Sequence, residues 1–204
     1  VRLIMSLYDY PRYYDLVYGS DWKAEFDFLT GVFNKHVCGE TKRLLEPACG
    51  TGRLIFRLQR AGFQVDGLDL SSKAVHYCNK RLQRHGLQAS AWVGDMTNFK
   101  VTSKYCAAFN TINSFRHLEQ HHQARDHLVC MAKAIRKGGI YVLGLHLSPK
   151  IGEASEEESW IARRGHLCVQ TSMWLIHRNL KQRYERFHMR YDIWTPTNHE
   201  TLDD

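Results

Sequence analysis

Hydrophobic and polar positions along the first half of the chain follow two alternating periods. A helical spacing of i, i+4, i+7 and i+11 predicts an amphipathic helix over residues 21–36, with Trp22, Phe26, Leu29 and Phe33 on its apolar face. Short apolar runs then alternate with amphipathic stretches. The predicted order is strand 42–46, helix 52–61, strand 63–69, helix 72–85 and strand 89–93. A βαβαβ order of this kind predicts an α/β fold, doubly wound around a mostly parallel sheet.

The second half continues this alternation. We expect a strand at 105–112, a helix around 119–137 and a continuous apolar strand at 140–147. Gly138 and Gly139 are expected to end the helix, because glycine favours the backbone conformation at a helix terminus. The main sheet is thereby predicted to contain at least five strands.

The last quarter of the chain has a different pattern. Residues 149–164 are polar and predict a connection with at most one short helix. Residues 168–177 and 182–194 alternate imperfectly between apolar and polar side chains, which predicts two strands around a turn at Asn179. These strands are either the sixth and seventh of the main sheet or a separate antiparallel hairpin. Residues 200–204 contain no apolar run that would form a closing strand.

Composition fits a folded globular chain. With 204 residues, 44% of them hydrophobic and 12% aromatic, the chain is long enough for one domain with a core. We divide it into an N-terminal lid and helix (1–40), a ligand-binding core (41–147) and a connection with a hairpin (148–204). No membrane span or secretion signal is expected, so the predicted location is the cytoplasm. The six cysteines are far apart and are expected to be reduced thiols rather than metal ligands.

The formal net charge of +7 raises the question of a nucleic-acid partner. Basic side chains are concentrated near the C-terminus, interleaved with aromatic ones: Arg178, Lys181, Arg183, Arg186 and Arg190. A solvated face of alternating strands explains this pattern as well as RNA contact does, and we favour it.

One stretch carries most of the chemical information: a predicted buried strand runs through Glu46 into a glycine turn and then into a helix that begins near Arg53. Gly50 and Gly52 allow a tight turn and close approach of a ligand, and the helix directs free N–H groups to the same place. A dinucleotide fingerprint would have a third glycine near Ile55 and no acid before the turn. A carboxylate here favours a ligand with an ammonium group, so we expect S-adenosylmethionine rather than NAD.

Two further acids belong to the same edge of the sheet. Asp69 and Asp95 each follow the preceding acid by about one strand-plus-helix unit, which places Glu46, Asp69 and Asp95 at the carboxyl ends of parallel strands. Ser71 is expected to cap the helix that follows Asp69.

These motifs together resemble the class I S-adenosylmethionine-dependent methyltransferases, in particular their small-molecule branch. The likeness covers roughly residues 8–147 and rests on the glycine turn at 46–52, the strand at 65–71, the segment 93–96 and the region 113–118. It implies a Rossmann-like sheet in which Asp69 holds the ribose hydroxyls and the segment around Asp95 flanks the adenine. It also favours the separate antiparallel hairpin, with the closing strands of the sheet lacking.

The resemblance implies a set of residues around the cofactor. An aromatic lid, residues 13–19, is expected to cover the methyl-donor site, where aromatic faces favour a cationic sulfonium. The predicted cofactor-binding residues are Tyr14, Tyr18, Glu46, Ala48, Cys49, Gly50, Gly52, Arg53, Asp69, Leu70, Asp95, Met96, Asn110 and Asn113.

Methyl transfer needs an aligned nucleophile and exclusion of water more than an elaborate acid-base apparatus. His117 is the candidate base, although a capping or surface role is the simpler explanation, and Tyr14 is the second catalytic candidate. A metal site at His117, His121, His122 and His127 is not expected, because no cysteine or carboxylate joins them at suitable spacing.

The predicted function is methyl transfer from S-adenosylmethionine, by in-line displacement, to a nucleophile on a small molecule. The alternatives are a nicotinamide-dependent oxidoreductase, an RNA or protein methyltransferase, and a truncated module that binds the cofactor without turnover. An exposed edge of the sheet also predicts a homodimer.

Overall fold

The computed structural model describes residues 6–37, 42–146 and 157–204. Two compact units account for these residues: one is residues 21–146, and the other combines residues of 1–20 with residues of 147–204. None of the helices in the described ranges is long and apolar enough to cross a membrane. Each unit has its own sheet.

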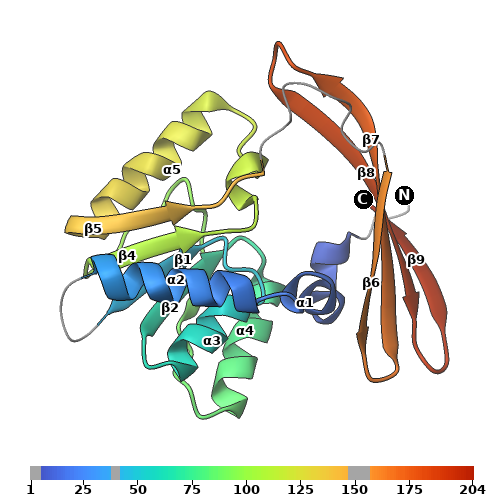
Figure 1. The fold of residues 1–204 in the computed structure, drawn as a ribbon, viewed down its shortest axis with the longest axis horizontal. Coiled ribbons are helices and arrows are strands. Elements are labelled where there is room, and N and C mark those ends of the chain that lie inside the picture. The colour runs from blue at the N-terminus through green and yellow to red at the C-terminus, as the bar shows by residue number, and fades with distance from the viewer. Residues whose placement is uncertain (1–5, 38–41, 147–156) are drawn as a thin grey trace. The chain divides into compact units, whose positions relative to one another are not determined.

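Residues 21–146 form the predicted parallel sheet (Figure 1), and its strand order is β3-β2-β1-β4-β5. Its strands are β1 (Arg43–Pro47), β2 (Gln64–Asp69), β3 (Ala91–Val93), β4 (Tyr105–Asn110) and β5 (Ile135–Leu143). Its helices are α2 (Lys23–His36), α3 (Arg53–Arg60), α4 (Ser72–Arg84) and α5 (His121–Ala134), and a short 3-10 helix, η2, spans Ser114–His117. Every predicted strand and helix of the βαβαβ segment is confirmed. The order reverses between β1 and β4, so the switch point lies there.

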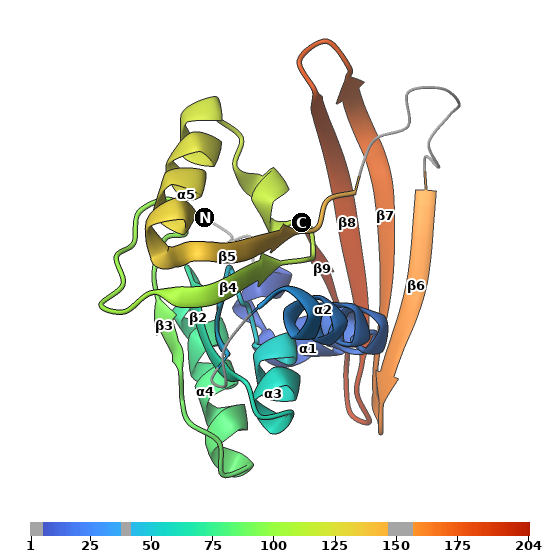
Figure 2. The same ribbon diagram turned by 60° about the vertical axis from the view of Figure 1, so that its left-hand side comes forward.

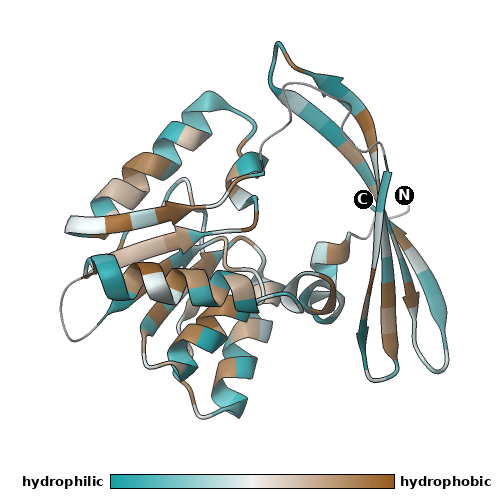
Figure 3. Cartoon of the chain, viewed as in Figure 1, coloured by the Kyte–Doolittle hydropathy of each residue, from teal (hydrophilic) through white to brown (hydrophobic). Residues whose placement is uncertain are grey.

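Two apolar layers cover the two faces of this sheet. On one face, α2, α3 and α4 pack against strand residues such as Leu44, Val65 and Phe109. On the other face, α5 contributes Met131 and packs against strand residues that include Leu68. Hydrophilic and hydrophobic residues alternate along the flanking helices, as Figure 3 shows for α2 and α5. This is the amphipathic pattern that predicted a doubly wound fold.

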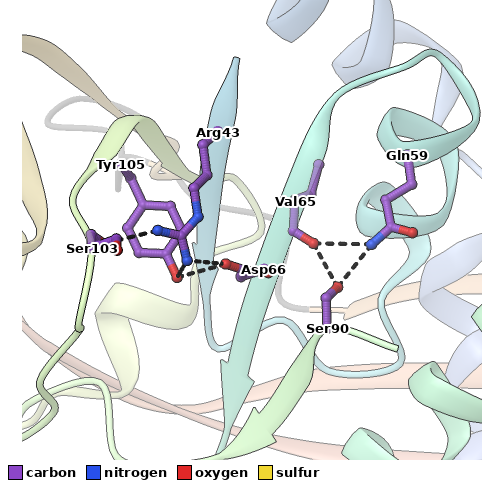
Figure 4. A network of polar contacts seen from close by, with 7 residues as sticks. All are labelled: Arg43, Gln59, Val65, Asp66, Ser90, Ser103 and Tyr105. Atoms are coloured by element: carbon purple, nitrogen blue, oxygen red, sulfur yellow. Dashed lines mark hydrogen bonds and ion pairs between the residues drawn. The ribbon is translucent and has the colours of Figure 1, made fainter. Parts of the chain in front are cut away.

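Polar side chains join neighbouring strands of the parallel sheet (Figure 4). The Arg43 guanidinium donates to the Asp66 carboxylate at 2.8 Å, to the Ser103 carbonyl at 3.1 Å and to the Tyr105 hydroxyl at 3.4 Å. The Tyr105 hydroxyl donates to the same carboxylate at 2.8 Å. A second group joins α3 to β2, because the Gln59 amide donates to the Val65 carbonyl at 3.1 Å. These contacts tie β1 and β2 to the start of β4 and to α3.

The transition from α5 to β5 differs from the prediction. The helix ends at Ala134 rather than at Gly138, and β5 already begins at Ile135. A register shift separates the pairing of Ile135 from that of Ile140, and Gly138 has a φ of +76° within the shifted segment. The two glycines therefore form a bulge in the edge strand, where glycine is tolerated because the backbone must bend.

The second unit is built on a four-stranded antiparallel sheet with order β6-β7-β8-β9. Its strands are β6 (Glu157–Arg164), β7 (Leu167–Asn179), β8 (Tyr184–Trp194) and β9 (His199–Asp203). The predicted hairpin is confirmed as β7 and β8, and the alternative that these strands extend the parallel sheet is wrong. The expected connection at 149–164 is wrong for residues 157–164, which form β6, and its earlier part lies outside the described residues. The C-terminal residues form a strand that was not predicted.

The N-terminal segment belongs to this second unit. It contains η1 (Leu7–Asp9) and α1 (Pro11–Gly19), whose apolar residues pack against the antiparallel sheet. Leu16 is in a buried cluster with Val169, Ile193 and Leu202. A polar contact adds to this packing, because Arg164 donates to the Asp15 carboxylate at 2.9 Å. The unit thus joins segments from both ends of the sequence.

The basic residues near the C-terminus are partly neutralised within this sheet. Arg178 pairs with Glu185 at 2.8 Å, and Arg190 pairs with Asp203 at 3.1 Å. These pairs support the interpretation of a solvated strand face over a continuous phosphate-binding strip.

Candidate functional site

The turn between β1 and α3 takes the left-handed backbone conformations that its sequence predicts. Gly50 and Gly52 have φ values of +52° and +69°, and Ala48 has a φ of +53°. A Cβ added to Gly52 would lie 2.1 Å from the Cys78 Sγ, so no larger residue fits there. The turn therefore needs glycine for its conformation and also for the close packing of α3 on α4.

Asp69 connects this turn to the next helix. Its Oδ2 accepts a hydrogen bond from the Gly50 N–H at 2.7 Å, and its Oδ1 accepts one from the Ser71 N–H at 2.8 Å. Ser71 caps α4, as predicted, because its Oγ accepts from the Ala74 N–H at 3.2 Å. Each carboxylate oxygen keeps further lone pairs, which can accept two neighbouring hydroxyl groups.

Two buried acceptors lie on either side of the switch point. Glu46 is near the carboxyl end of β1 and Asn110 is the last residue of the neighbouring β4. The Asn110 side-chain N–H donates to the Pro47 carbonyl at 2.8 Å, which joins the two strand ends. Glu46 Oε2 and Asn110 Oδ1 are both buried and have no hydrogen-bond partner among the described residues. Buried acceptors of this kind are rare in folded proteins, and they suit a ligand that brings N–H donors.

The environment of Glu46 makes its charge state responsive to a ligand. Burial raises the pKa of its carboxyl from 4.5 to about 8, while the nearby Arg53 guanidinium acts in the opposite direction. Arg53 is itself buried and forms an ion pair with Glu25 on α2. It also donates to the Asp21 carbonyl at 3.3 Å. The guanidinium thus holds the start of α2 beside the glycine turn, and a cationic ligand would favour the ionised form of Glu46.

The ends of β2 and β3 present an apolar surface next to these acids. Leu70, which follows Asp69, is 73% exposed, and Val93 at the end of β3 is 55% exposed. Asp69 and Val93 are paired across the two strands. Exposed aliphatic groups beside a hydrogen-bonding carboxylate are suited to the flat ring of a nucleoside.

The segment that follows β3 forms a tight turn. Asp95 is exposed, and its Oδ1 accepts from the Thr97 N–H at 2.7 Å and from the Thr97 Oγ1 at 2.8 Å. Asp95 therefore caps this turn. Met96 is buried, and its carbonyl oxygen lies 3.0 Å from the His127 Nδ1.

Other predicted residues have roles in the backbone, at the surface or within the antiparallel unit. Asn113 has a φ of +50°, and its Oδ1 accepts from the His146 N–H at 2.7 Å, so it holds the segment after β5. His117 is exposed at the end of η2. Tyr14 and Tyr18 lie on α1 in the antiparallel unit, with their ring centroids 4.9 Å apart. Burial raises the pKa of the Cys49 thiol, as expected for a packing residue.

Sequence reasoning missed two contributors. Glu25 gave no signal, because its partner Arg53 is distant in sequence. His127 was considered only as part of a histidine cluster, whereas its position one helical turn before Met131 placed it on the apolar face of the predicted helix. A polar residue on such a face was the available signal. Within the described part of the chain, no group of three metal-ligating side chains is close enough to hold a metal ion.

Residues 44–139 match a family described as a methyltransferase domain. The dTDP-3-amino-3,4,6-trideoxy-alpha-D-glucopyranose N,N-dimethyltransferase of Streptomyces venezuelae is 27% identical over 138 residues, covering 66% of this chain and 56% of the relative. The glycine N-methyltransferase of Oryctolagus cuniculus is 30% identical over 134 residues, covering 57% of this chain and 43% of the relative. The chain thus spans about half the length of these curated relatives.

Solved structures share the fold. The crystal structure of Streptomyces venezuelae DesVI aligns with a TM-score of 0.80 at 22% identity, covering 94% of this chain and 79% of that one. The SAM-bound structure of CalS10, an amino pentose methyltransferase from Micromonospora echinaspora, aligns with a TM-score of 0.75 at 19% identity, with the same coverage of 94% and 79%. The alignments span most of both described units.

Proposed function

We propose that this chain, which belongs to the class I S-adenosylmethionine-dependent methyltransferases, binds S-adenosylmethionine at the carboxyl edge of its parallel sheet. It would transfer the methyl group to a nucleophile on a small molecule. The observation that carries the proposal is the pair of buried acceptors, Glu46 Oε2 and Asn110 Oδ1, at the switch point beside a glycine turn. An ammonium group supplies the donors that these two oxygens need.

The remaining contacts suit the other parts of the same ligand. Asp69 is the group for the two ribose hydroxyls, because its carboxylate is already oriented by Gly50 and Ser71. Leu70 and Val93 offer apolar surface for the adenine ring, next to the turn at Asp95. The pyrophosphate of NAD would instead meet Glu46, and two like charges repel.

The chain's contribution to catalysis is mainly positioning. When bound, S-adenosylmethionine would supply an activated methyl carbon for the nucleophile's lone pair, with a sulfide leaving group that keeps the electron pair of the broken carbon–sulfur bond. Glu46 and Asn110 would hold one end of the ligand and Asp69 the other, which would orient the methyl donor between them. Such alignment can lower the barrier by roughly 7–11 kcal/mol in favourable systems. His117 remains our candidate base for the acceptor's proton, and Tyr14 remains the second candidate, for orienting the acceptor.

We propose an amine as the acceptor's nucleophile. This rests on the names of two relatives, an amino-sugar N,N-dimethyltransferase and a glycine N-methyltransferase. An amine that is protonated near neutral pH has no free lone pair and must lose that proton before it can attack, which gives a base a role. The acceptor pocket itself is not fixed by the fold or by the cofactor residues.

Calorimetry with S-adenosylhomocysteine tests the cofactor assignment. We expect the wild-type chain to bind it, and Glu46→Gln to raise the Kd about tenfold or more, because the charge-assisted contact with the ammonium is lost. The matched control is 5′-methylthioadenosine, which lacks the amino-acid group and should bind both forms equally. A folded wild-type chain that does not bind millimolar S-adenosylhomocysteine would contradict the proposal.

Thermal shift separates the remaining cofactor alternative. Stabilisation by S-adenosylhomocysteine but not by NAD is expected, whereas stabilisation by NAD alone would favour an oxidoreductase.

Turnover on a panel of small amines distinguishes an active enzyme from a module that only binds. Salt-dependent RNA binding that is lost when Arg183, Arg186 and Arg190 are replaced by Ala would instead favour an RNA substrate.

A homodimer through the sheet edge is the partner that we propose beyond the acceptor. β5 is the last strand in the order β3-β2-β1-β4-β5, and Figure 2 shows it beside β4. An edge strand offers backbone groups that can pair with a second chain. Sedimentation analysis should then give a concentration-dependent dimer, and a monomer at every concentration would refute the idea.

A further inference from the structure

His127 is a polar side chain in the apolar interface between α5 and the parallel sheet. It is 0% exposed, and the neighbouring helix residues that face the same way, Met131 and Ala134, are buried apolar groups. A buried imidazole must have partners for both ring nitrogens. The structure supplies both: Nδ1 lies 3.0 Å from the Met96 carbonyl oxygen, and Nε2 lies 2.9 Å from the Tyr141 hydroxyl.

These partners determine which ring nitrogen carries the proton. The Met96 carbonyl is only an acceptor, so Nδ1 must be the donor. Burial lowers the pKa of His127, which favours the neutral ring. In a neutral ring Nε2 then accepts a hydrogen bond, and the Tyr141 hydroxyl on β5 donates it. A single tautomer satisfies every group.

The imidazole holds the segment that was assigned to the adenine. Besides the bond from His127 to the Met96 carbonyl, the Cys130 Sγ on the same helix donates to the Thr97 carbonyl at 3.3 Å. Two consecutive carbonyl groups are thus fixed by side chains one helical turn apart. The ring of Phe115, in η2 after β4, packs edge-on against the imidazole with centroids 5.6 Å apart. His127 therefore contacts both the turn after β3 and the segment after β4.

We infer that His127 is a positioning residue for nucleoside binding: its Nδ1–H fixes the backbone at Met96, and this sets the turn that receives the adenine. The inference rests on the proposed function, because it is the cofactor that gives this turn a ligand. His127 itself does not touch the cofactor in this scheme. It acts through the position of the 95–97 backbone.

Two amide replacements separate positioning from simple packing. In His127→Asn the side-chain N–H lies close to where Nδ1 was, so the bond to Met96 can be kept. In His127→Gln the amide instead reaches toward Tyr141, and the Met96 carbonyl loses its donor. We expect Asn to retain cofactor affinity within about threefold, and Gln to weaken it about tenfold, because a buried carbonyl is left unpaired. Both variants remove the aromatic ring, so their difference reports the hydrogen bond.

Two probes and one control variant locate the effect. S-adenosylhomocysteine and 5′-methylthioadenosine share the adenosine group, so His127→Gln should weaken both by the same factor. Met131→Ala is the stability control, since it removes buried volume from the apolar cluster on the same helix, which does not include Met96, and it should lower Tm but leave both Kd values unchanged. Steady-state kinetics should show a raised KM for the cofactor with kcat nearly unchanged.

The possible results lead to distinct conclusions. If the wild-type chain binds S-adenosylhomocysteine, and His127→Gln and His127→Asn bind it with equal affinity, this inference is overturned while the proposed function stays intact. Absence of wild-type binding would overturn both. If His127→Gln does not fold, His127→Phe replaces it: an aromatic ring is kept while the Nδ1–H donor to the Met96 carbonyl is lost, so a Kd that rises about tenfold supports the inference, whereas an unchanged Kd overturns it.

Discussion

At the scale of single residues, the buried carboxyl of Glu46 links ligand binding to protons. Its pKa is raised to about 8, so at pH 7 the carboxyl is mostly protonated in the ligand-free chain. A bound ammonium favours the ionised form, and binding should therefore release most of one proton. Calorimetry at pH 7 in two buffers of different ionisation enthalpy measures this release. The same titration with Glu46→Gln should show none.

The same group makes folding stability depend on pH. The folded chain holds a proton that the unfolded chain releases above its usual pKa of 4.5, so stability is lost as pH rises from about 4.5 to 8. The loss is on the order of a few kcal/mol, at about 1.4 kcal/mol for each pKa unit. Urea unfolding at pH 5, 7 and 9 should show a smaller decline for Glu46→Gln. An equally steep decline in that variant would assign the effect to other groups.

Asp69 is expected to set the preference for a ribose. Because its two oxygens are the acceptors that we propose for the ribose hydroxyls, wild-type protein should bind 5′-methylthioadenosine more tightly than the 2′-deoxy analogue, by roughly tenfold. Asp69→Ala should weaken the first ligand to nearly the affinity of the second. The difference between the two ligands is the informative quantity, since the substitution also removes the acceptor of the Gly50 N–H. A preserved preference in the variant would argue against this role.

At this scale, the sequence predicts the motif residues better than the residues that hold the site in place through tertiary contacts. Glu46, Gly50 and Asp69 could be identified because short spacings place them at strand ends. Glu25 and His127 could not, since their partners Arg53 and Met96 are brought near them only by tertiary packing.

At the scale of elements, the glycine turn has an internal control. Gly52 and Gly86 have nearly the same φ, +69° and +68°, but a Cβ would meet Cys78 Sγ at 2.1 Å in the first and nothing within 4 Å in the second. Gly86→Ala should cost about 1–2 kcal/mol, the usual penalty for a left-handed residue. Gly52→Ala should cost more and also abolish S-adenosylhomocysteine binding. Denaturation and calorimetry on both variants measure the two effects, and equal losses of stability would show that the contact with Cys78 relaxes.

Hydrophobic periodicity predicts the elements that carry an apolar pattern of their own. It fails for strands that form because they pair with a neighbouring strand. Helices α2 to α4 and strands β1 to β3 match the predicted ranges closely, because each contains an unbroken apolar pattern. Strands β6 and β9 contain many charged residues and few apolar ones, and they become strands by pairing with β7 and β8. The bulge at Gly138 is also a result of pairing with β4, since the local sequence is equally suited to a helix end.

At the scale of the whole molecule, the antiparallel unit depends on residues from distant parts of the chain. Leu16 on α1 is 1% exposed in the same cluster as Val169 and Ile193. Leu16→Ala should destabilise this unit by about 2–5 kcal/mol, because it leaves a cavity in a small core. Hydrogen exchange should then show lower protection of the β7 and β8 amides. Tyr8→Ala, at a half-exposed position of the preceding 3-10 helix, should have a much smaller effect.

This joining of distant segments also has a consequence for synthesis on the ribosome. Residues 7–19 are made before the parallel unit, but the strands that cover Leu7, Leu16 and Val17 are made only after it. At translation speeds of about 5–20 residues per second, this interval lasts on the order of ten seconds. The apolar side of α1 is exposed throughout that time, while the intervening unit can already fold. The nascent chain thus carries an apolar helix segment without the strands that later cover it, and segments of this kind are bound by molecular chaperones.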